Sequence, residues 1–192
     1  MEIIKQYIEF VKRWEGALSK DTADSAAKYP CPTPYKGKSG YHTNVGITYK
    51  VWVSMFGKDN DKRFFLMNDE DWFDIWNRLY FEPMQADRIK SMSVAIFMVG
   101  MAWGSGMRQA VISTQKVVNQ IGKAKVEVDG VIGPRTIQAI NDTDPVDMFN
   151  GLIEERGRFF KAIAKGKNAK FLKGWMNRLT DYNKTFNPKN YQ

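Results

Sequence analysis

Apolar side chains recur at three- and four-residue spacing in several stretches of the chain, and each such stretch predicts an amphipathic helix. The clearest is residues 2–15, where charged side chains occupy the opposite face and Gly16 marks a helix stop. Further helices are expected from Thr48 to about Phe56, over residues 68–82, 94–104 and 107–121, from Pro134, from Pro145, and over about 171–179. No segment shows a convincing strand pattern, so an all-α fold is predicted.

Residues 94–104 are apolar on nearly every side, which predicts a buried helix. This run is about half the length that a membrane-spanning helix needs, so we expect no membrane span. Gly100 and Gly104, four positions apart, would let a second helix approach closely.

Length and composition set the scale of the fold. With 192 residues, 43% of them hydrophobic, the chain can form one large core or two small ones. The single cysteine, Cys31, excludes an internal disulfide. Cys31 also lies between two prolines in a chain with one histidine, which argues against a catalytic thiol.

Positive charge gathers in the second half of the chain. The formal net charge is +8, and residues 156–189 hold ten Lys or Arg against one acid, Asp181. Such a cluster attracts polyanions such as nucleic acid, anionic lipid or bacterial wall polymers, although a merely solvated surface would also explain it.

Glu15 is the candidate general acid. It occupies the last turn of the first predicted helix, next to Trp14. An aromatic neighbour partly desolvates a carboxyl group and favours its protonated form, which an acid catalyst needs at neutral pH. An exposed glutamate at a helix end is the simpler reading of these residues alone.

A long polar connection follows over residues 17–41. Pro30, Pro32 and Pro34 exclude helix there and favour extended or turn backbone. Connections of this length in a compact domain are usually functional or mobile. The connection leads into residues 43–48, where Thr48 is expected to cap the next helix.

Two sets of motifs in this order resemble a known architecture. Residues 10–16 (FVKRWEG) and 43–48 (TNVGIT) resemble glycoside hydrolase family 108, and Gln115, residues 128–136 (VDGVIGPRT) and 171–178 (FLKGWMNR) resemble the predicted peptidoglycan domain that follows it. The resemblance implies N-acetylmuramidase activity and a lysozyme-like helical fold, with the catalytic part packed against the peptidoglycan part. Relatives are phage or prophage endolysins, and some are labelled secretion activators. The expected regions are 1–92 (catalytic), 93–182 (peptidoglycan-binding) and 183–192 (tail).

The chain departs from the family pattern at several positions. Ala17 replaces a glycine, and relatives have Asp and Asn where this chain has Gly100 and Gly104. The connection has also gained roughly fourteen residues. If the insertion follows the family's aspartate, that residue is Asp24; if it precedes it, the matching position is Lys38 and the acid is lost.

The resemblance gives the site a set of expected roles. Glu15 would protonate the leaving oxygen, Asp24 or else Asp21 would activate water, and Thr43 would help to hold that water. The residues expected to bind substrate are Trp14, Tyr41, His42 and Asn44. Neither a metal ion nor an organic cofactor is expected.

Two other functions compete with a muramidase. A wall-binding protein with degraded catalysis would explain the missing polar positions. A basic nucleic-acid-binding protein would explain the charge, but no recognition fold supports it, so nucleic acid is not an expected partner. The expected partners are bacterial peptidoglycan and, next, anionic wall polymers. The N-terminus lacks the order of a signal peptide, so we expect synthesis in a bacterial or phage-infected cytoplasm, export by another route, and action at the cell wall or periplasm.

Overall fold

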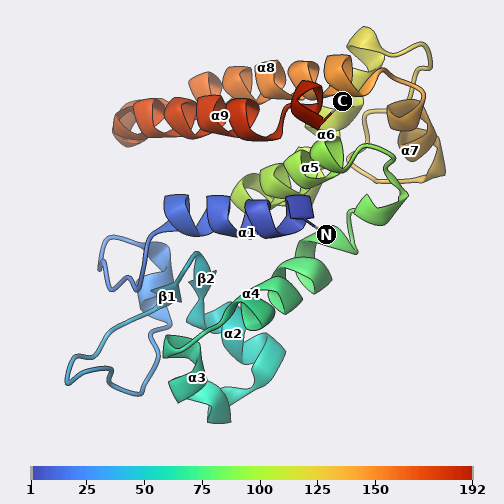
Figure 1. Ribbon diagram of the computed structural model, residues 1–192. Helices are drawn as coiled ribbons and strands as arrows, with labels where there is room; N and C mark the ends of the chain where they lie inside the picture. The colour runs from blue at the N-terminus through green and yellow to red at the C-terminus, as the bar shows by residue number, and fades with distance from the viewer. Residues whose placement is uncertain (1, 192) are drawn as a thin grey trace. The chain divides into compact units, whose positions relative to one another are not determined.

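The computed structural model describes residues 2–191, and helices make up most of this part of the chain (Figure 1). It divides into two compact units, the first ending at Arg78 and the second beginning at Leu79. The predicted all-α class is confirmed. No helix between residues 2 and 191 is both long enough and apolar enough to cross a membrane.

The first unit is built from short helices and loops. Its helices are α1 (Glu2–Glu15), α2 (Tyr49–Phe56), α3 (Asp61–Phe65) and α4 (Asp69–Trp76), with 3-10 turns at Ser25–Lys28 and Lys58–Asn60. Aromatic rings fill its core. The buried ring of Tyr7 on α1 lies 6.5 Å from that of Trp72 and 5.3 Å from that of Trp76, both on α4. The apolar face predicted for residues 2–15 is therefore the face that α1 buries.

A small hairpin joins the long connection to α2. Strands β1 (Thr43–Asn44) and β2 (Ile47–Thr48) pair antiparallel, and the turn between them has φ of 45° at Val45 and 79° at Gly46. Two successive left-handed residues are typical of a type I′ turn, which disfavours a β-branched residue such as Val45. The Val45 carbonyl accepts a 3.1 Å hydrogen bond from the indole of Trp72, which helps to hold the strained turn in place.

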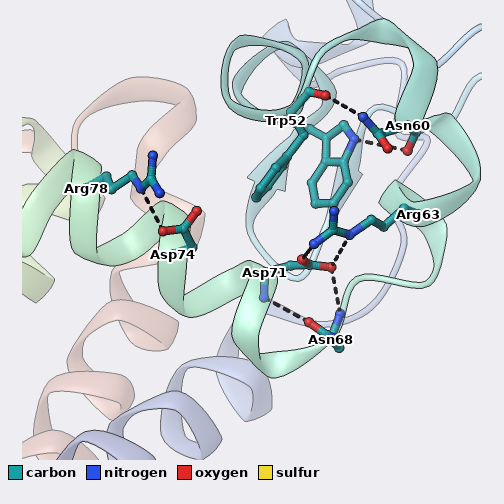
Figure 2. A network of polar contacts seen from close by, with 8 residues as sticks. Trp52, Asn60, Arg63, Asn68, Asp71, Asp74 and Arg78 are labelled. Atoms are coloured by element: carbon teal, nitrogen blue, oxygen red, sulfur yellow. Dashed lines mark hydrogen bonds and ion pairs between the residues drawn. The ribbon is translucent and has the colours of Figure 1, made fainter.

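A polar network fixes the passage from α3 to α4 (Figure 2). The Asn68 side chain and Asp71 form a reciprocal capping box at the start of α4. The Asp71 carboxylate is buried and ion-paired with Arg63, whose Nε lies 3.2 Å from Oδ2. On the outer side of α4, Arg78 pairs with Asp74 at 2.7 Å. The acids at the start of the predicted helix therefore cap it, as their positions suggest.

The second unit is a bundle of longer helices. They are α5 (Met92–Ser105), α6 (Met107–Ile121), α7 (Pro134–Asn141), α8 (Pro145–Ile163) and α9 (Leu172–Phe186), with 3-10 turns at Ala86–Arg88, Gly166–Phe171 and Pro188–Tyr191. Helix α5 packs on both α6 and α8 and is buried along most of its length, as its uniform apolar character predicts. Pro134 and Pro145 occupy the first turns of α7 and α8.

A buried glutamine organises the turn before α7. Gln115 on α6 donates from Nε2 to Asp129 Oδ1 at 2.7 Å, and its Oε1 accepts the Gly130 N–H at 2.9 Å. The Asp129 carboxylate also accepts the Val131 N–H at 2.8 Å. These hydrogen bonds hold the Asp-Gly turn against α6.

Element boundaries differ from the sequence prediction at three places. The helix expected over residues 68–82 is α4 followed by a π-helix at Asn77–Phe81, which spans the division between the units along the chain. That division lies at Arg78 rather than at the expected residue 92. The expected polar tail from residue 183 instead begins inside α9, which continues to the buried Phe186 because that ring packs 4.8 Å from the ring of Tyr182.

Candidate active site

Glu15 is the last residue of α1 and is partly exposed. The helix ends there because Gly16 takes a left-handed φ of 72°, which glycine adopts without steric cost. The preceding Trp14 is also partly exposed, and its ring lies 6.4 Å from that of Phe10. The expected arrangement of a carboxyl group beside an aromatic side chain at a helix end is therefore present.

A backbone pair brings the chain after Glu15 back to β1. The Ser19 N–H donates to the Thr43 carbonyl at 2.8 Å, and the His42 N–H donates to the Ser19 carbonyl at 3.0 Å. Four residues span at most about 14 Å of extended chain, so this pair keeps Glu15 within that reach of Thr43. Two motifs that are 28 positions apart in sequence are thus held close together in the first unit.

His42 supports Thr43 from below. Its ring is fully buried, with Nε2 3.1 Å from the Asp21 carbonyl oxygen and Nδ1 2.9 Å from Thr43 Oγ1. A carbonyl only accepts hydrogen bonds, so Nε2 carries the proton and, in the neutral ring, Nδ1 accepts the Thr43 hydroxyl hydrogen. The Thr43 oxygen then keeps its lone pairs for a water molecule. The expected contact of His42 with substrate does not fit this burial.

The two candidate second acids lie on one exposed loop. Asp21 Oδ1 accepts the Ala23 N–H at 2.9 Å, and Asp24 Oδ1 accepts the Ala26 N–H at 2.9 Å to cap the 3-10 turn that follows. The Asp24 N–H also donates to the Asp21 carbonyl at 3.0 Å, the same oxygen that His42 contacts. Both carboxylates are therefore tied to the segment that carries Thr43.

The remaining expected substrate contacts divide into two pairs. Asn44 is buried and donates its side-chain amide to the Phe64 carbonyl at 2.7 Å, so its role here is structural. Tyr41 is partly exposed, and Lys20 Nζ lies 5.6 Å from the centre of its ring. Trp14 and Tyr41 therefore remain available to a ligand, whereas His42 and Asn44 do not.

A cluster around Asp61 was not predicted from the sequence. Its carboxylate accepts hydrogen bonds from Thr33 Oγ1, at 2.7 Å, and from the Tyr49 hydroxyl. Burial, and then the charge of Asp61, raise the pKa of the Tyr49 hydroxyl, and burial raises the pKa of the Cys31 thiol to about 11. An open hollow of about 530 Å³ lies beside Asp61. The buried cysteine between two prolines was the one local signal of this cluster.

The geometry offers acid–base groups and no metal ligand set. Within residues 2–191, no group of three or more His, Cys, Asp or Glu side chains is placed to hold a metal ion.

Comparison with known proteins gives two family matches in the expected order. Residues 8–106 match the model described as Glycosyl hydrolase 108, and residues 109–180 match the one described as Predicted Peptidoglycan domain. The chain is also similar in structure to SagA of Brucella abortus, with a TM-score of 0.70 and 23% sequence identity over 95% of this chain and 92% of that one. That likeness supports the predicted all-α, lysozyme-like fold. A comparison with curated protein sequences finds no match.

Proposed function

The chain belongs to the glycosyl hydrolase 108 family, and from this premise we propose that it is an N-acetylmuramidase that cleaves the glycan strand of bacterial peptidoglycan. The observation that carries the proposal lies inside the matched region. Glu15 ends α1, and the Ser19–Thr43 pair keeps the following segment against β1. The Predicted Peptidoglycan domain at residues 109–180 supports the same polymer as the partner.

In the proposed reaction Glu15 is the general acid. Its carboxyl proton passes to the glycosidic oxygen as the bond from that oxygen to the sugar's anomeric carbon breaks, leaving an oxocarbenium-like centre. A water molecule that donates a hydrogen bond to Thr43 Oγ1 attacks this centre. Asp24 or Asp21 takes the proton that the water loses. Trp14 and Tyr41 offer faces for the sugar rings.

The shape of the long loop supports Asp24 as the family's aspartate. Residues 35–38 form a closed turn of their own, in which the N–H groups of Tyr35 and Lys38 each donate to the other's carbonyl, at 2.8 and 3.0 Å. A self-contained turn is what an inserted segment is expected to form, and this one follows Asp24. The direct link between the Asp21 carbonyl and His42 keeps Asp21 as the second candidate.

Replacing Glu15 with Gln tests the proposal. Glu15→Gln keeps the size of the side chain and removes its proton, so clearing of a wall suspension and release of reducing ends should fall by about 10²–10⁴-fold. The melting temperature should stay unchanged. Glu9→Gln, at an exposed position of the same helix, is the matched control and should clear walls at the wild-type rate. Clearing by Glu15→Gln at the wild-type rate would remove Glu15 from the mechanism.

The second acid can be assigned in the same assay. Of Asp24→Asn and Asp21→Asn, the variant that loses activity without a fall in melting temperature identifies the group that activates water. Both carboxylates also cap local backbone, which is the observation that favours a binding protein with impaired catalysis as the alternative function. That alternative predicts sedimentation with sacculi and no new reducing ends.

The expected setting follows from the family. We propose a phage or prophage endolysin, or a secretion activator, that is made in the cytoplasm and acts at the cell wall. Peptidoglycan is the expected partner, and anionic wall polymers are a second one for the basic residues 156–189.

A further inference from the structure

Arg156 is a buried cation in the second unit. It lies on α8 with 8% of its surface exposed, and its Nη1 donates to Ser105 Oγ, at the end of α5, at 2.7 Å. The centre of the guanidinium is 4.4 Å from the centre of the Phe160 ring and 5.0 Å from that of Phe159. The group is therefore held between a hydroxyl and two aromatic rings.

No carboxylate within residues 2–191 forms an ion pair with Arg156. Burial, and then the charge of Arg178 on α9, lower the pKa of Arg156 to about 10, so the group is still protonated at neutral pH. Arginine is rarely buried in proteins without a paired anion, because desolvating an unpaired charge is costly. The aromatic rings and the partial negative charge at the end of α5 offset part of this cost, but neither supplies a countercharge.

One side of the guanidinium is left uncovered by the chain. A Cβ atom added at Gly104 would lie 2.9 Å from Arg156 Nη2, so the bare glycine leaves space in front of that nitrogen. Gly104 is itself exposed. The Nη2 donors can therefore be reached from solvent across the last turn of α5.

A row of aromatic rings continues away from this opening. The Phe160 ring stacks on Trp175 at 5.3 Å, and Trp175 stacks on Phe171 at 5.9 Å. Phe171 is 47% exposed. Flat aromatic faces beside a cationic group suit a ligand that has an apolar face next to an anion.

We propose that Arg156, reached past Gly104, binds a free carboxylate of the peptidoglycan stem peptide, with the Phe160–Trp175–Phe171 row beside it taking the apolar face of the adjoining sugar or peptide. A carboxylate is planar and matches the coplanar N–H donors of a guanidinium. The assignment rests on the proposed function for its choice of polymer. It places recognition of the peptide in the second unit.

Binding of a soluble fragment to the full chain tests this site. The probes are muramyl-L-alanyl-D-glutamate and the same compound with its carboxylates amidated, titrated by calorimetry. The wild type should prefer the acid by about tenfold, the worth of one charge-assisted pair. Arg156→Met should lose that preference. Arg158→Met, at an exposed arginine on α8 paired with Glu155 at 3.0 Å, is the control and should keep it.

A second variant separates loss of the site from loss of the fold. Gly104→Asp places a carboxylate of the protein's own against Arg156 Nη2, so it should abolish binding of the acid and raise the melting temperature. A misfolded protein cannot give both results. If Arg156→Met lowers the melting temperature and keeps the tenfold preference, Arg156 only supports Ser105 and the rings, and the proposal is wrong.

The probes also separate this proposal from its neighbours. Inorganic phosphate that displaces the acid at equal concentration would overturn the carboxylate assignment in favour of a general oxyanion site. The fragment holds one sugar and no glycosidic bond to cut. Failure of binding therefore leaves the hydrolase proposal intact, and failure of Glu15→Gln to stop clearing leaves this site intact.

Discussion

The two units hold their functional groups in different ways. In the first, the candidate catalytic residues lie at a helix end and on a long connection whose position depends on single hydrogen bonds, such as Ser19 to Thr43. In the second, Arg156 projects from the middle of a 19-residue helix that packs on three others. Catalysis would thus use a segment that can adjust, and binding would use a rigid surface. Four predictions follow the same contrast, from the largest effect to the smallest.

Truncation of Phe149 should damage the second unit most. Its ring is fully buried and lies 5.4 Å from Phe97 and 6.5 Å from Tyr182. Phe149→Ala leaves a cavity, so it should lower the free energy of unfolding by about 3–5 kcal/mol. Urea unfolding followed by circular dichroism measures this. A loss below about 1 kcal/mol would show that this core is not closely packed.

Removal of Arg63 should have a smaller effect on the first unit. Arg63→Met leaves the buried Asp71 carboxylate without its ion pair, but Arg63 is 52% exposed and solvent screens part of the interaction. We expect a loss of about 1–2 kcal/mol. The rate of Cys31 labelling is the measurement, because a buried thiol with a pKa raised to about 11 reacts only when this unit opens. Lys62→Met, an exposed neighbour, should leave the rate unchanged, and equal rates in both variants would contradict the prediction.

Relief of the strained turn should stabilise the first unit. Asparagine tolerates the left-handed φ of 45° found at Val45. Val45→Asn should therefore slow Cys31 labelling and add about 0.5–1 kcal/mol to the free energy of unfolding. Val45→Thr keeps the β-branch and should add nothing. Equal stability of the two variants would mean that the backbone at Val45 stores no strain.

The smallest effect concerns pH. The hydrogen bond from Gln115, and next that from the Val131 N–H, lower the pKa of Asp129 below its usual value. Because the folded pKa is lowered, this contribution to stability is complete above the unfolded value of about 3.9 and disappears as the pH falls through the folded value. The Gly130 amide signal in an NMR titration should therefore have its midpoint below that unfolded value. Gln115→Met should raise the midpoint, and an unchanged midpoint would assign the shift to another group.

Local signals in the sequence account for most of the fold. Predicted helices at residues 2–15 and 107–121 have the bounds of α1 and α6 because glycine ends both and periodicity defines their faces. The cap at Thr48 was also predictable, since capping depends on residues two or three positions away. These features need no knowledge of distant parts of the chain.

The site was less predictable because distant contacts form it. Glu15 and Thr43 could be named from motifs, but the pairing of Ser19 with Thr43 and the burial of His42 depend on residues more than twenty positions apart. Arg156 was visible only as one of ten basic residues. Its burial depends on Ser105 from another helix. The roles of Glu15, Asp24 and Thr43 stay predictions until activity is measured.

The closed turn at residues 35–38 has a practical consequence. Lys36 and Lys38 are exposed at its tip, and the bond from the Cys31 N–H to the Tyr41 carbonyl, at 2.7 Å, holds the chain on both sides of it. A protease cut after either lysine would leave two fragments still attached to the same scaffold. The tip is thus a place to insert a tag, to open the chain for circular permutation, or to divide the protein into complementing halves.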